Sequence, residues 1–114
     1  MSELIDQFRA KLSEELISSI SKKDQESVST LRGIMSALDN ASALTPDEIS
    51  KLPDAGKSEV PRKILSQFDI EQVLLKEIVV RENAKADFER LGNSAQAALI
   101  GKSIELISGL EKYL

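Results

Sequence analysis

The chain has 114 residues, a formal net charge of −4, and neither cysteine nor histidine. The length fits one domain over residues 1–114, and the charge argues against a nucleic-acid binder held by bulk positive charge. The absence of cysteine excludes disulfides and thiolate metal sites, and the absence of histidine removes the usual general base near neutral pH. No apolar run approaches the roughly 18 residues of a membrane span, and the N-terminus lacks a secretory signal, so the expected location is cytoplasmic.

Two helices are expected in the first third of the chain, over residues 2–20 and 25–43. Their apolar residues recur at helical spacing, and Asp24 is placed to cap the second helix. The connection through Lys22 and Lys23 is short, so the two helices should lie antiparallel. The expected buried stripes are Leu4, Ile5, Phe8, Leu12, Leu16 and Ile20 in the first helix, and Val28, Leu31, Met35 and Leu38 in the second.

A short helix is expected over residues 46–52. Thr45 can cap it, Pro46 suits the first helical position, and Glu48 can complete a capping box. Pro53 and Gly56 then prevent the helix from continuing, and the residues that follow are expected to form a loop.

Two longer helices are expected over residues 70–91 and 95–114. Asp69 is expected to open the first, with Gln72 three residues later as its capping partner. Gly92 should supply the left-handed residue that ends that helix, and Ser94 should cap the second. The turn between them is so short that they must be antiparallel neighbours. The predicted fold class is therefore all-α: an antiparallel bundle of two helical hairpins with a short extra helix in the central linker.

The helix over residues 70–91 carries two charged residues inside its apolar stripe. Glu77 and Arg81 are four residues apart, in the favourable acid-before-base order. We expect an ion pair that lines the bundle, because charged residues in such places are normally paired. The alternative is that Arg81, with Lys85 and Arg32, presents donors to a phosphate. The apolar stripe itself is Ile70, Val73, Leu74, Ile78, Ala84, Phe88 and Leu91.

The last helix has an apolar face that is wider than one partner helix needs. The first expectation is that this face contacts two helices of the same chain. The alternative is a surface for self-association or for another protein. On that alternative, the surface combines the last helix with a second apolar ridge on the preceding one, and its residues are Leu75, Val79, Ile100, Ile104 and Ile107.

None of the short segments that are similar to a catalytic or phosphate-binding motif is complete. Gly101-Lys102-Ser103 is similar to the end of a phosphate-binding loop, but position 96 is Gln where the loop needs a glycine, and no strand precedes it. The acidic residues are too scattered for a metal cage. The sequence therefore predicts no catalytic residue, no cofactor and no metal, and argues against an enzyme.

Several short motifs occur in order along nearly the whole chain. They are Lys22-Lys23-Asp24, Ser29-Thr30-Leu31-Arg32, Ala37-Leu38-Asp39-Asn40-Ala41, Glu59-Val60-Pro61-Arg62, Val73-Leu74-Leu75-Lys76-Glu77-Ile78 with Arg81, Phe88-Glu89-Arg90-Leu91-Gly92, and Leu110-Glu111-Lys112-Tyr113-Leu114. This ordered set resembles the GatB/YqeY family. The family is named for the tail of the B subunit of the tRNA-dependent amidotransferase, a carbon–nitrogen ligase whose catalytic site lies outside that tail.

The resemblance implies a non-catalytic helical module that binds tRNA or a translation-related protein. The rival hypothesis is a protein-interaction or homodimerisation module with no nucleic-acid role. Family members usually continue past the Tyr-Leu ending into a second helical domain, which carries much of the tRNA contact and is expected to be absent here. Asn93 also stands where an arginine commonly follows the turn glycine. The residues expected to contact tRNA are Lys22, Lys23, Arg32, Arg81 and Lys85.

Overall fold

The computed structural model describes residues 4–51 and 63–114, and within these ranges every regular element is a helix. The all-α prediction is therefore confirmed. In chain order the elements are α1 (Leu4–Ser21), α2 (Gln25–Ser42), α3 (Pro46–Ser50), α4 (Gln67–Arg90), α5 (Ser94–Gly109) and the 3₁₀ turn η1 (Leu110–Tyr113). The first residues of the expected helix 2–20, the last residue of 46–52, the stop signals Pro53 and Gly56, and the motif 59–62 lie outside the described residues.

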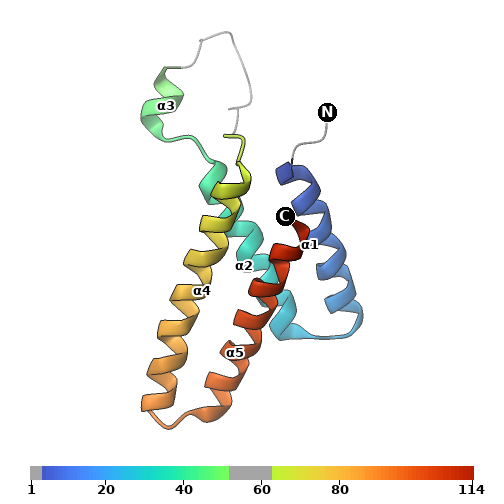
Figure 1. The fold of residues 1–114 in the computed structure, drawn as a ribbon, viewed down its shortest axis with the longest axis vertical. Helices are drawn as coiled ribbons and strands as arrows, with labels where there is room; N and C mark the ends of the chain where they lie inside the picture. Colours follow the sequence, from blue (N-terminus) through green and yellow to red (C-terminus); the bar gives the residue numbers. More distant parts are fainter. Residues whose placement is uncertain (1–3, 52–62) are drawn as a thin grey trace.

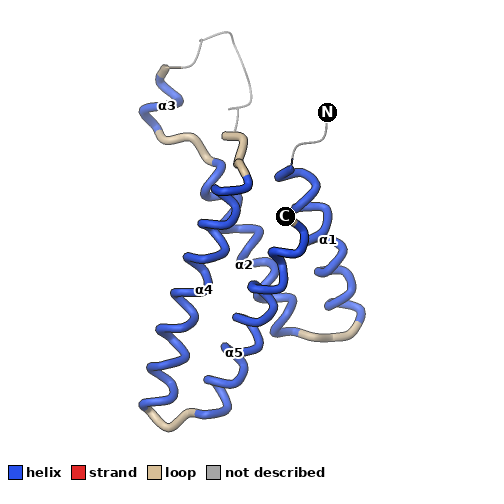
Figure 2. Tube along the Cα trace, in the orientation of Figure 1, coloured by secondary structure: helices blue, strands red, loops and turns tan. Residues whose placement is uncertain are grey.

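The helices form two antiparallel hairpins, as predicted (Figure 1). The first hairpin is α1 with α2, and the second is α4 with α5. Helix α2 packs against its own partner α1 and makes most of the contact with the second hairpin, through α4 and α5. The short helix α3 lies beyond the end of α2, to which a loop joins it (Figure 2). The whole chain is elongated, with principal extents of 56 × 30 × 23 Å.

The hydrophobic core lies where the two hairpins meet. Side chains spaced three or four residues apart share one face of a helix, so each helix sends one row inward. The fully buried members are Phe8 and Leu12 of α1, Leu31, Ile34 and Leu38 of α2, Ile70 and Leu74 of α4, Ile107 of α5 and Leu110 of η1. All five helical segments that meet here contribute, so the core joins the first third of the sequence to the last.

The starts of α2 and α4 confirm one capping signal and correct another. Asp24 caps α2 as predicted, through its bond from the Ser27 amide. The expected opening of α4 at Asp69 is wrong, because Ser66 is the cap. The hydroxyl of Ser66 accepts from the Asp69 amide at 3.1 Å, and the Asp69 carboxylate accepts from the Ser66 amide at 3.0 Å. This reciprocal capping box satisfies two backbone donors at once. It pairs Ser66 with Asp69, whereas the sequence prediction paired Asp69 with Gln72.

The turn between α4 and α5 is one residue out of register with the prediction. Gly92 takes the left-handed conformation, with φ 77°, as expected. The predicted cap at Ser94 is wrong, because the Asn93 side chain accepts from the Gln96 amide at 3.2 Å. Ser94 is therefore the first residue of the helix. Asparagine and serine cap about equally well, so the sequence alone could not separate the two.

The chain ends in a 3₁₀ turn, whereas the prediction extended the last α-helix to residue 114. Helix α5 ends at Gly109, and η1 follows from Leu110. Leu110 is buried in the core, and the Tyr113 hydroxyl donates a hydrogen bond to Glu15 of α1. That bond raises the pKa of Tyr113. The tighter turn thus ties the end of the second hairpin to the first.

The α4–α5 hairpin projects past the α1–α2 turn (Figure 1). On α4 the only fully enclosed positions are Ile70 and Leu74, both in its first half. Leu91 was expected in the apolar stripe, but it is 79% exposed at the tip. The prediction failed there because the stripe assumed cover along the whole length of α4, and the helices of the first hairpin do not reach the tip.

Candidate binding groove

The turn between α1 and α2 has a well-defined backbone. Lys23 is left-handed, with φ 57°. The amides of Lys23 and Asp24 donate to the carbonyl oxygens of Ile20 and Ser19 at 3.0 and 2.9 Å, which closes the end of α1. Asp24 then accepts from the Ser27 hydroxyl at 2.7 Å and from the Ser27 amide at 3.2 Å, and these bonds lower the pKa of Asp24. The two helix ends are therefore held in a fixed relation.

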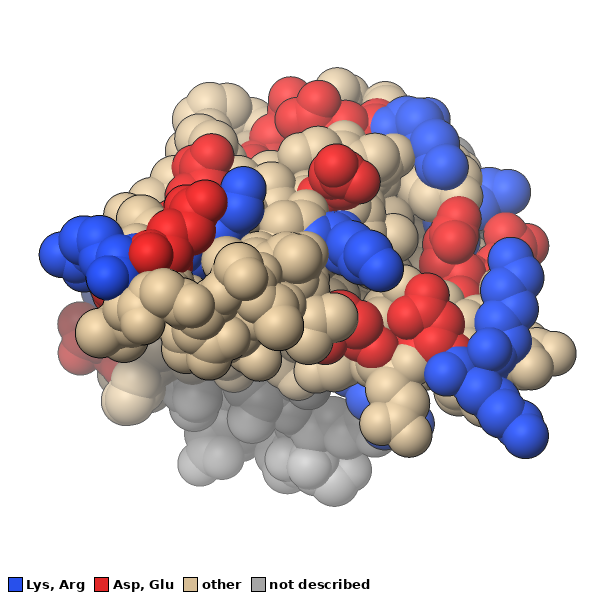
Figure 3. Space-filling model, turned by 90° about the horizontal axis from the view of Figure 1, so that it is seen from below, with Lys and Arg blue, Asp and Glu red and all other residues tan. Residues whose placement is uncertain are grey.

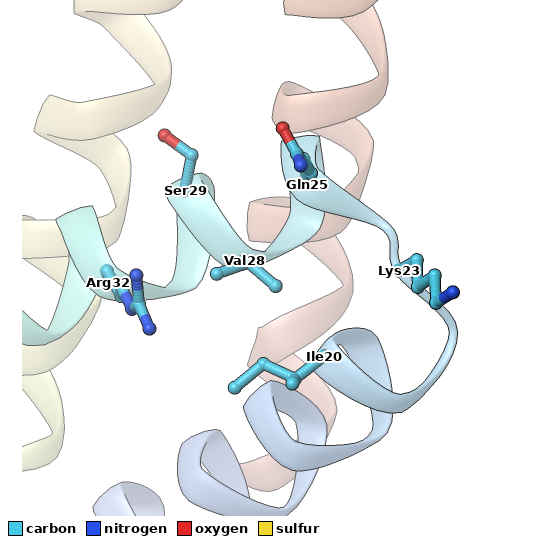
Figure 4. A pocket seen from close by; sticks show the side chains of 6 residues that line it. All are labelled: Ile20, Lys23, Gln25, Val28, Ser29 and Arg32. Atoms are coloured by element: carbon cyan, nitrogen blue, oxygen red, sulfur yellow. The ribbon is translucent and has the colours of Figure 1, made fainter.

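An open groove of about 550 Å³ lies between α1 and α2 beside this turn. Ile20 from α1 and Val28 from α2 face the same space, and Arg32 lies one turn further along α2 (Figure 4). Lys23 extends outward from the turn at the other end. Ile20 is 50% exposed, although Phe8 and Leu12, earlier in the same stripe of α1, are fully buried. The groove thus has an apolar floor with a cation at each end, and Gln25 and Ser29 complete its lining.

Arg32 is the one arginine of the described residues that has no acidic partner. The others form the ion pairs Arg9–Asp39, Arg81–Glu77 and Arg90–Asp87. Arg32 is exposed and keeps its full set of guanidinium donors for a ligand. A guanidinium beside apolar side chains suits a carboxylate or a phosphate that is attached to an apolar group.

Arg81 has a structural environment of a different kind. Its Nη1 donates to the Glu77 carboxylate at 2.9 Å and to the Glu77 carbonyl oxygen at 3.1 Å, and its Nε donates to the Ser103 hydroxyl at 3.0 Å. Ser103 in turn is 2.7 Å from the Thr30 hydroxyl. A Cβ on Gly33 would come within 3.4 Å of Arg81 Nη2. This polar crossing (Glu77, Arg81, Ser103 and Thr30, beside Gly33) joins α2, α4 and α5, and the ion pair expected from the sequence is present in it.

Lys85 lies against the neighbouring helix of its own hairpin. A Cβ on Gly101 would come within 3.6 Å of Lys85 Cε, so the lysine stem covers a position that has no side chain of its own. Lys85 also lines a hollow at the hairpin tip together with Glu89 and Ser94.

The five residues predicted to contact tRNA therefore do not form one patch. Lys22, Lys23 and Arg32 lie at the α1–α2 end, where they are exposed. Arg81 and Lys85 lie on α4 and are half-buried against other helices. The structure thus divides the predicted cationic site into an open group and an enclosed group.

The predicted apolar surface divides in the same way. Ile107 is fully buried in the core, so its place in that surface is wrong. Ile100 and Ile104 are half-buried, while Leu75 and Val79 are 54% and 45% exposed. The last helix has a broad apolar face because it packs against both α4 and α2, which was the first expectation from the sequence.

Ile20 and Val28 are functional candidates that the sequence pattern missed. Both fit the apolar stripes of their helices and were expected in the core. The second hairpin covers the first half of α1, where Ile5, Phe8 and Leu12 are buried, but it leaves the end of α1 open. Their place in the sequence is the one hint of this exposure. Each residue lies within one helical turn of the Lys22–Asp24 connection, and near such a connection an apolar stripe can extend beyond the buried core.

The described residues include no cluster of three or more acidic side chains that could hold a metal ion. None of the described helices is long and apolar enough to cross a bilayer. No family model, no curated protein and no solved structure matches this chain.

Proposed function

We propose that this protein is a non-catalytic helical module that binds a partner protein in the groove between α1 and α2. The observation that carries the proposal is Arg32, an exposed arginine without an acidic partner among the described residues, beside the apolar floor of Ile20 and Val28. A partner segment with an apolar side chain and a neighbouring carboxylate would satisfy both features at once.

Several features favour a protein over a nucleic acid as the ligand. The chain has a net charge of −4, and acidic and basic side chains alternate over the end of the molecule seen in Figure 3. A phosphate backbone is normally met by a continuous basic surface. The floor of the groove is aliphatic, whereas single-stranded nucleic acid is usually met by aromatic side chains on which bases stack. The resemblance to the GatB/YqeY family suggests a translation-related protein as the partner.

Site-specific photo-crosslinking in cells tests the groove directly. A crosslinking residue at position 20 should give a discrete protein adduct, and Arg32→Glu in the same chain should abolish it. Position 17 is the matched control, because Ile17 is also an exposed isoleucine of α1 (67%) but does not line the groove. The same adduct from both positions, or an adduct indifferent to Arg32→Glu, would refute the proposal.

A second candidate is tRNA binding by Lys22, Lys23 and Arg32. It is supported by the family resemblance and by the position of these three cations at one end of the α1–α2 hairpin. The purified protein would then bind tRNA with an affinity that falls steeply as the salt concentration rises. The logarithm of the binding constant should fall against the logarithm of the salt concentration with a slope of about −1 for each phosphate contact. Arg32→Glu should weaken that binding. An adduct from position 20 that ribonuclease removes would favour tRNA over a protein partner.

A further inference from the structure

A small crevice lies between the first turns of α2 and the middle of α5, apart from the groove between α1 and α2. Its volume is about 160 Å³, which leaves room for a molecule of a few non-hydrogen atoms. Glu26, Ser27 and Thr30 line it from α2, and Lys102 and Ser103 line it from α5. Other residues of α2 line the groove, so the two hollows lie on different faces of that helix. This second hollow is called the α2–α5 crevice below.

Two buried hydroxyl groups in the crevice wall have hydrogen bonds of fixed direction. Thr30 donates its one hydroxyl hydrogen to the Glu26 carbonyl oxygen at 2.9 Å, so it must accept in its 2.7 Å contact with Ser103. Ser103 therefore donates to Thr30, and it accepts from Arg81 Nε at 3.0 Å. Both hydroxyl hydrogens are thus used within the protein. What the two hydroxyl groups can offer to a ligand is their remaining lone pairs.

The charged groups of the crevice leave one carboxylate without a partner. Asp24 also lines the crevice, and it accepts from the Ser27 hydroxyl at 2.7 Å and from the Ser27 amide at 3.2 Å. These bonds lower the pKa of Asp24, and the charge of the nearby Lys102 ammonium lowers it further. The carboxylate of Glu26 has neither a hydrogen bond nor an ion pair among the described residues. Two carboxylates and one ammonium leave an excess of negative charge, and Glu26 is where it is unmatched.

A hollow of this kind suits a cation that carries several N–H donors, because its wall offers mainly acceptors. Leu99 and Leu106 also line the crevice and offer apolar contact to a short alkyl stem. We propose that the α2–α5 crevice binds a small protonated alkylamine, whose ammonium group lies beside Glu26 and the hydroxyl oxygens of Thr30 and Ser103. This site shares no lining residue with the groove between α1 and α2, so it stands or falls independently of the proposed partner binding.

A solution NMR titration of the purified chain at constant ionic strength tests the crevice, with n-butylammonium as the probe. We expect saturable shifts of the Ser27, Thr30 and Ser103 amide signals, with a dissociation constant in the millimolar range for so small a ligand. Neutral n-butanol has the same number of non-hydrogen atoms and should give no saturable shift. The absence of saturable shifts with n-butylammonium overturns the proposal. Saturable binding of butyrate at the same amides also overturns it, because the crevice would then act as an anion site of Lys102.

Three variants test the roles of the charges. Glu26→Gln should weaken n-butylammonium binding about fivefold or more, because it removes the unpaired charge and keeps the backbone acceptor of Thr30. Glu105→Gln is the matched control, since Glu105 is an exposed glutamate of α5 that does not line the crevice. Lys102→Met should tighten binding, because it removes an ammonium that competes with the ligand for the same carboxylates.

Circular dichroism should show equal helicity in the three variants. If Glu26→Gln loses helicity, Lys102→Met still decides the matter, since it predicts a gain of affinity that a damaged fold would not give. Equal weakening by Glu26→Gln and Glu105→Gln overturns the proposal, because the amine would then respond only to the net charge of the chain. Weaker binding to a fully helical Lys102→Met overturns it as well.

Discussion

Arg81 and Arg32 were predicted to belong to one cationic site, yet the fold places them in opposite situations. Arg81 lies in the polar crossing and satisfies its donors on Glu77 and Ser103. Arg32 lies at the lip of the α1–α2 groove with no carboxylate from the described residues. Both are arginines on helices that contact each other. The difference lies in what the neighbouring helices bring to each guanidinium.

The comparison indicates that an arginine is free for a ligand where the neighbouring helices bring no acidic or hydroxyl group to it. At the crossing, Ser103 of α5 and Thr30 of α2 complete the hydrogen bonds of Arg81, directly or through each other. At the groove, the lining residue from α1 is Ile20, which has no polar group to offer Arg32. A ligand must therefore supply the acidic group at the groove, whereas the chain itself supplies it at the crossing.

The largest expected contrast is between a core isoleucine and a groove isoleucine. Ile107→Ala should lower the free energy of unfolding by about 2–5 kcal/mol, because it leaves a cavity where the hairpins meet. Ile20→Ala should lower it by less than about 1 kcal/mol, since half of that side chain is already in water. Chemical denaturation of both variants measures the difference. Equal losses would mean that the groove is part of the core, and the comparison would fail.

Substitution of Arg81 should lower the free energy of unfolding more than substitution of Arg32. The difference should be smaller than the one between Ile107 and Ile20. Arg81→Met keeps the aliphatic stem and removes the donors, so Glu77 and Ser103 each lose a partner. The expected loss is about 1–2 kcal/mol, reduced from the fully buried case because solvent reaches a fifth of the Arg81 side chain. Arg32→Met should change stability by no more than about 0.5 kcal/mol.

Denaturation and crosslinking together distinguish a loss of stability from a loss of binding in these two variants. Arg32→Met should keep the stability of the parent chain and lose the adduct formed from position 20. Arg81→Met, examined at a temperature where it remains folded, should keep that adduct. The reverse pattern would assign the ligand site to the crossing and remove the case for the groove.

The helices and their pairing could be predicted from sequence because they rest on local signals. Apolar spacing located the helices, and the short connections at Lys22–Asp24 and Gly92 forced two antiparallel hairpins. The caps were harder, because Ser66 and Asp69, or Asn93 and Ser94, offer near-equal alternatives a few residues apart. Only the hydrogen bonds of the folded chain choose between them.

The candidate site could be predicted only in part, because burial depends on where helices end relative to one another. The pairing of Glu77 with Arg81 follows from their spacing on one helix. The burial of Ile107 and the exposure of Ile20 do not, since both occupy apolar stripes of similar quality. Their difference in burial arises from contacts between segments that are far apart in the sequence. The apolar pattern of a single helix carries no information about those contacts.

A smaller effect is expected at the turn that shapes the groove. Lys23 is left-handed, a conformation that costs a residue with a Cβ about 1–2 kcal/mol more than glycine. Lys23→Gly should therefore raise the free energy of unfolding by about 0.5–1 kcal/mol, because the gain slightly exceeds the added freedom of the unfolded chain. Lys22→Gly is the control, and should lower stability, since Lys22 lacks positive φ. Thermal unfolding measures both. A loss in Lys23→Gly would show that the lysine side chain stabilises the turn.

The smallest expected effect is the response to acid. Hydrogen bonds lower the pKa of three capping carboxylates: from Ser27 to Asp24, from Thr45 to Glu48 and from Ser66 to Asp69. A carboxylate whose folded pKa is lowered stabilises the fold above its unfolded pKa, near 3.8 for aspartate and 4.5 for glutamate. That stability is lost as pH falls through the folded value. With no histidine in the sequence, the unfolding midpoint should stay flat around neutral pH and fall only in acid.

Asp24→Asn measures how much of the acid response comes from the cap of α2, which lies beside the groove. Asparagine caps a helix about as well as aspartate but does not titrate, so the variant should remain close to the parent at neutral pH. In acid the two unfolding midpoints should converge further, because the parent loses a charge that the variant never had. Asp69→Asn is the matched change at α4, away from the groove. Crosslinking from position 20 is then repeated in cell extract buffered at acid pH. If the adduct no longer forms with the parent but still forms with Asp24→Asn, the cap of α2 is what holds the groove in shape; if neither chain forms it, the titrating group belongs to the ligand.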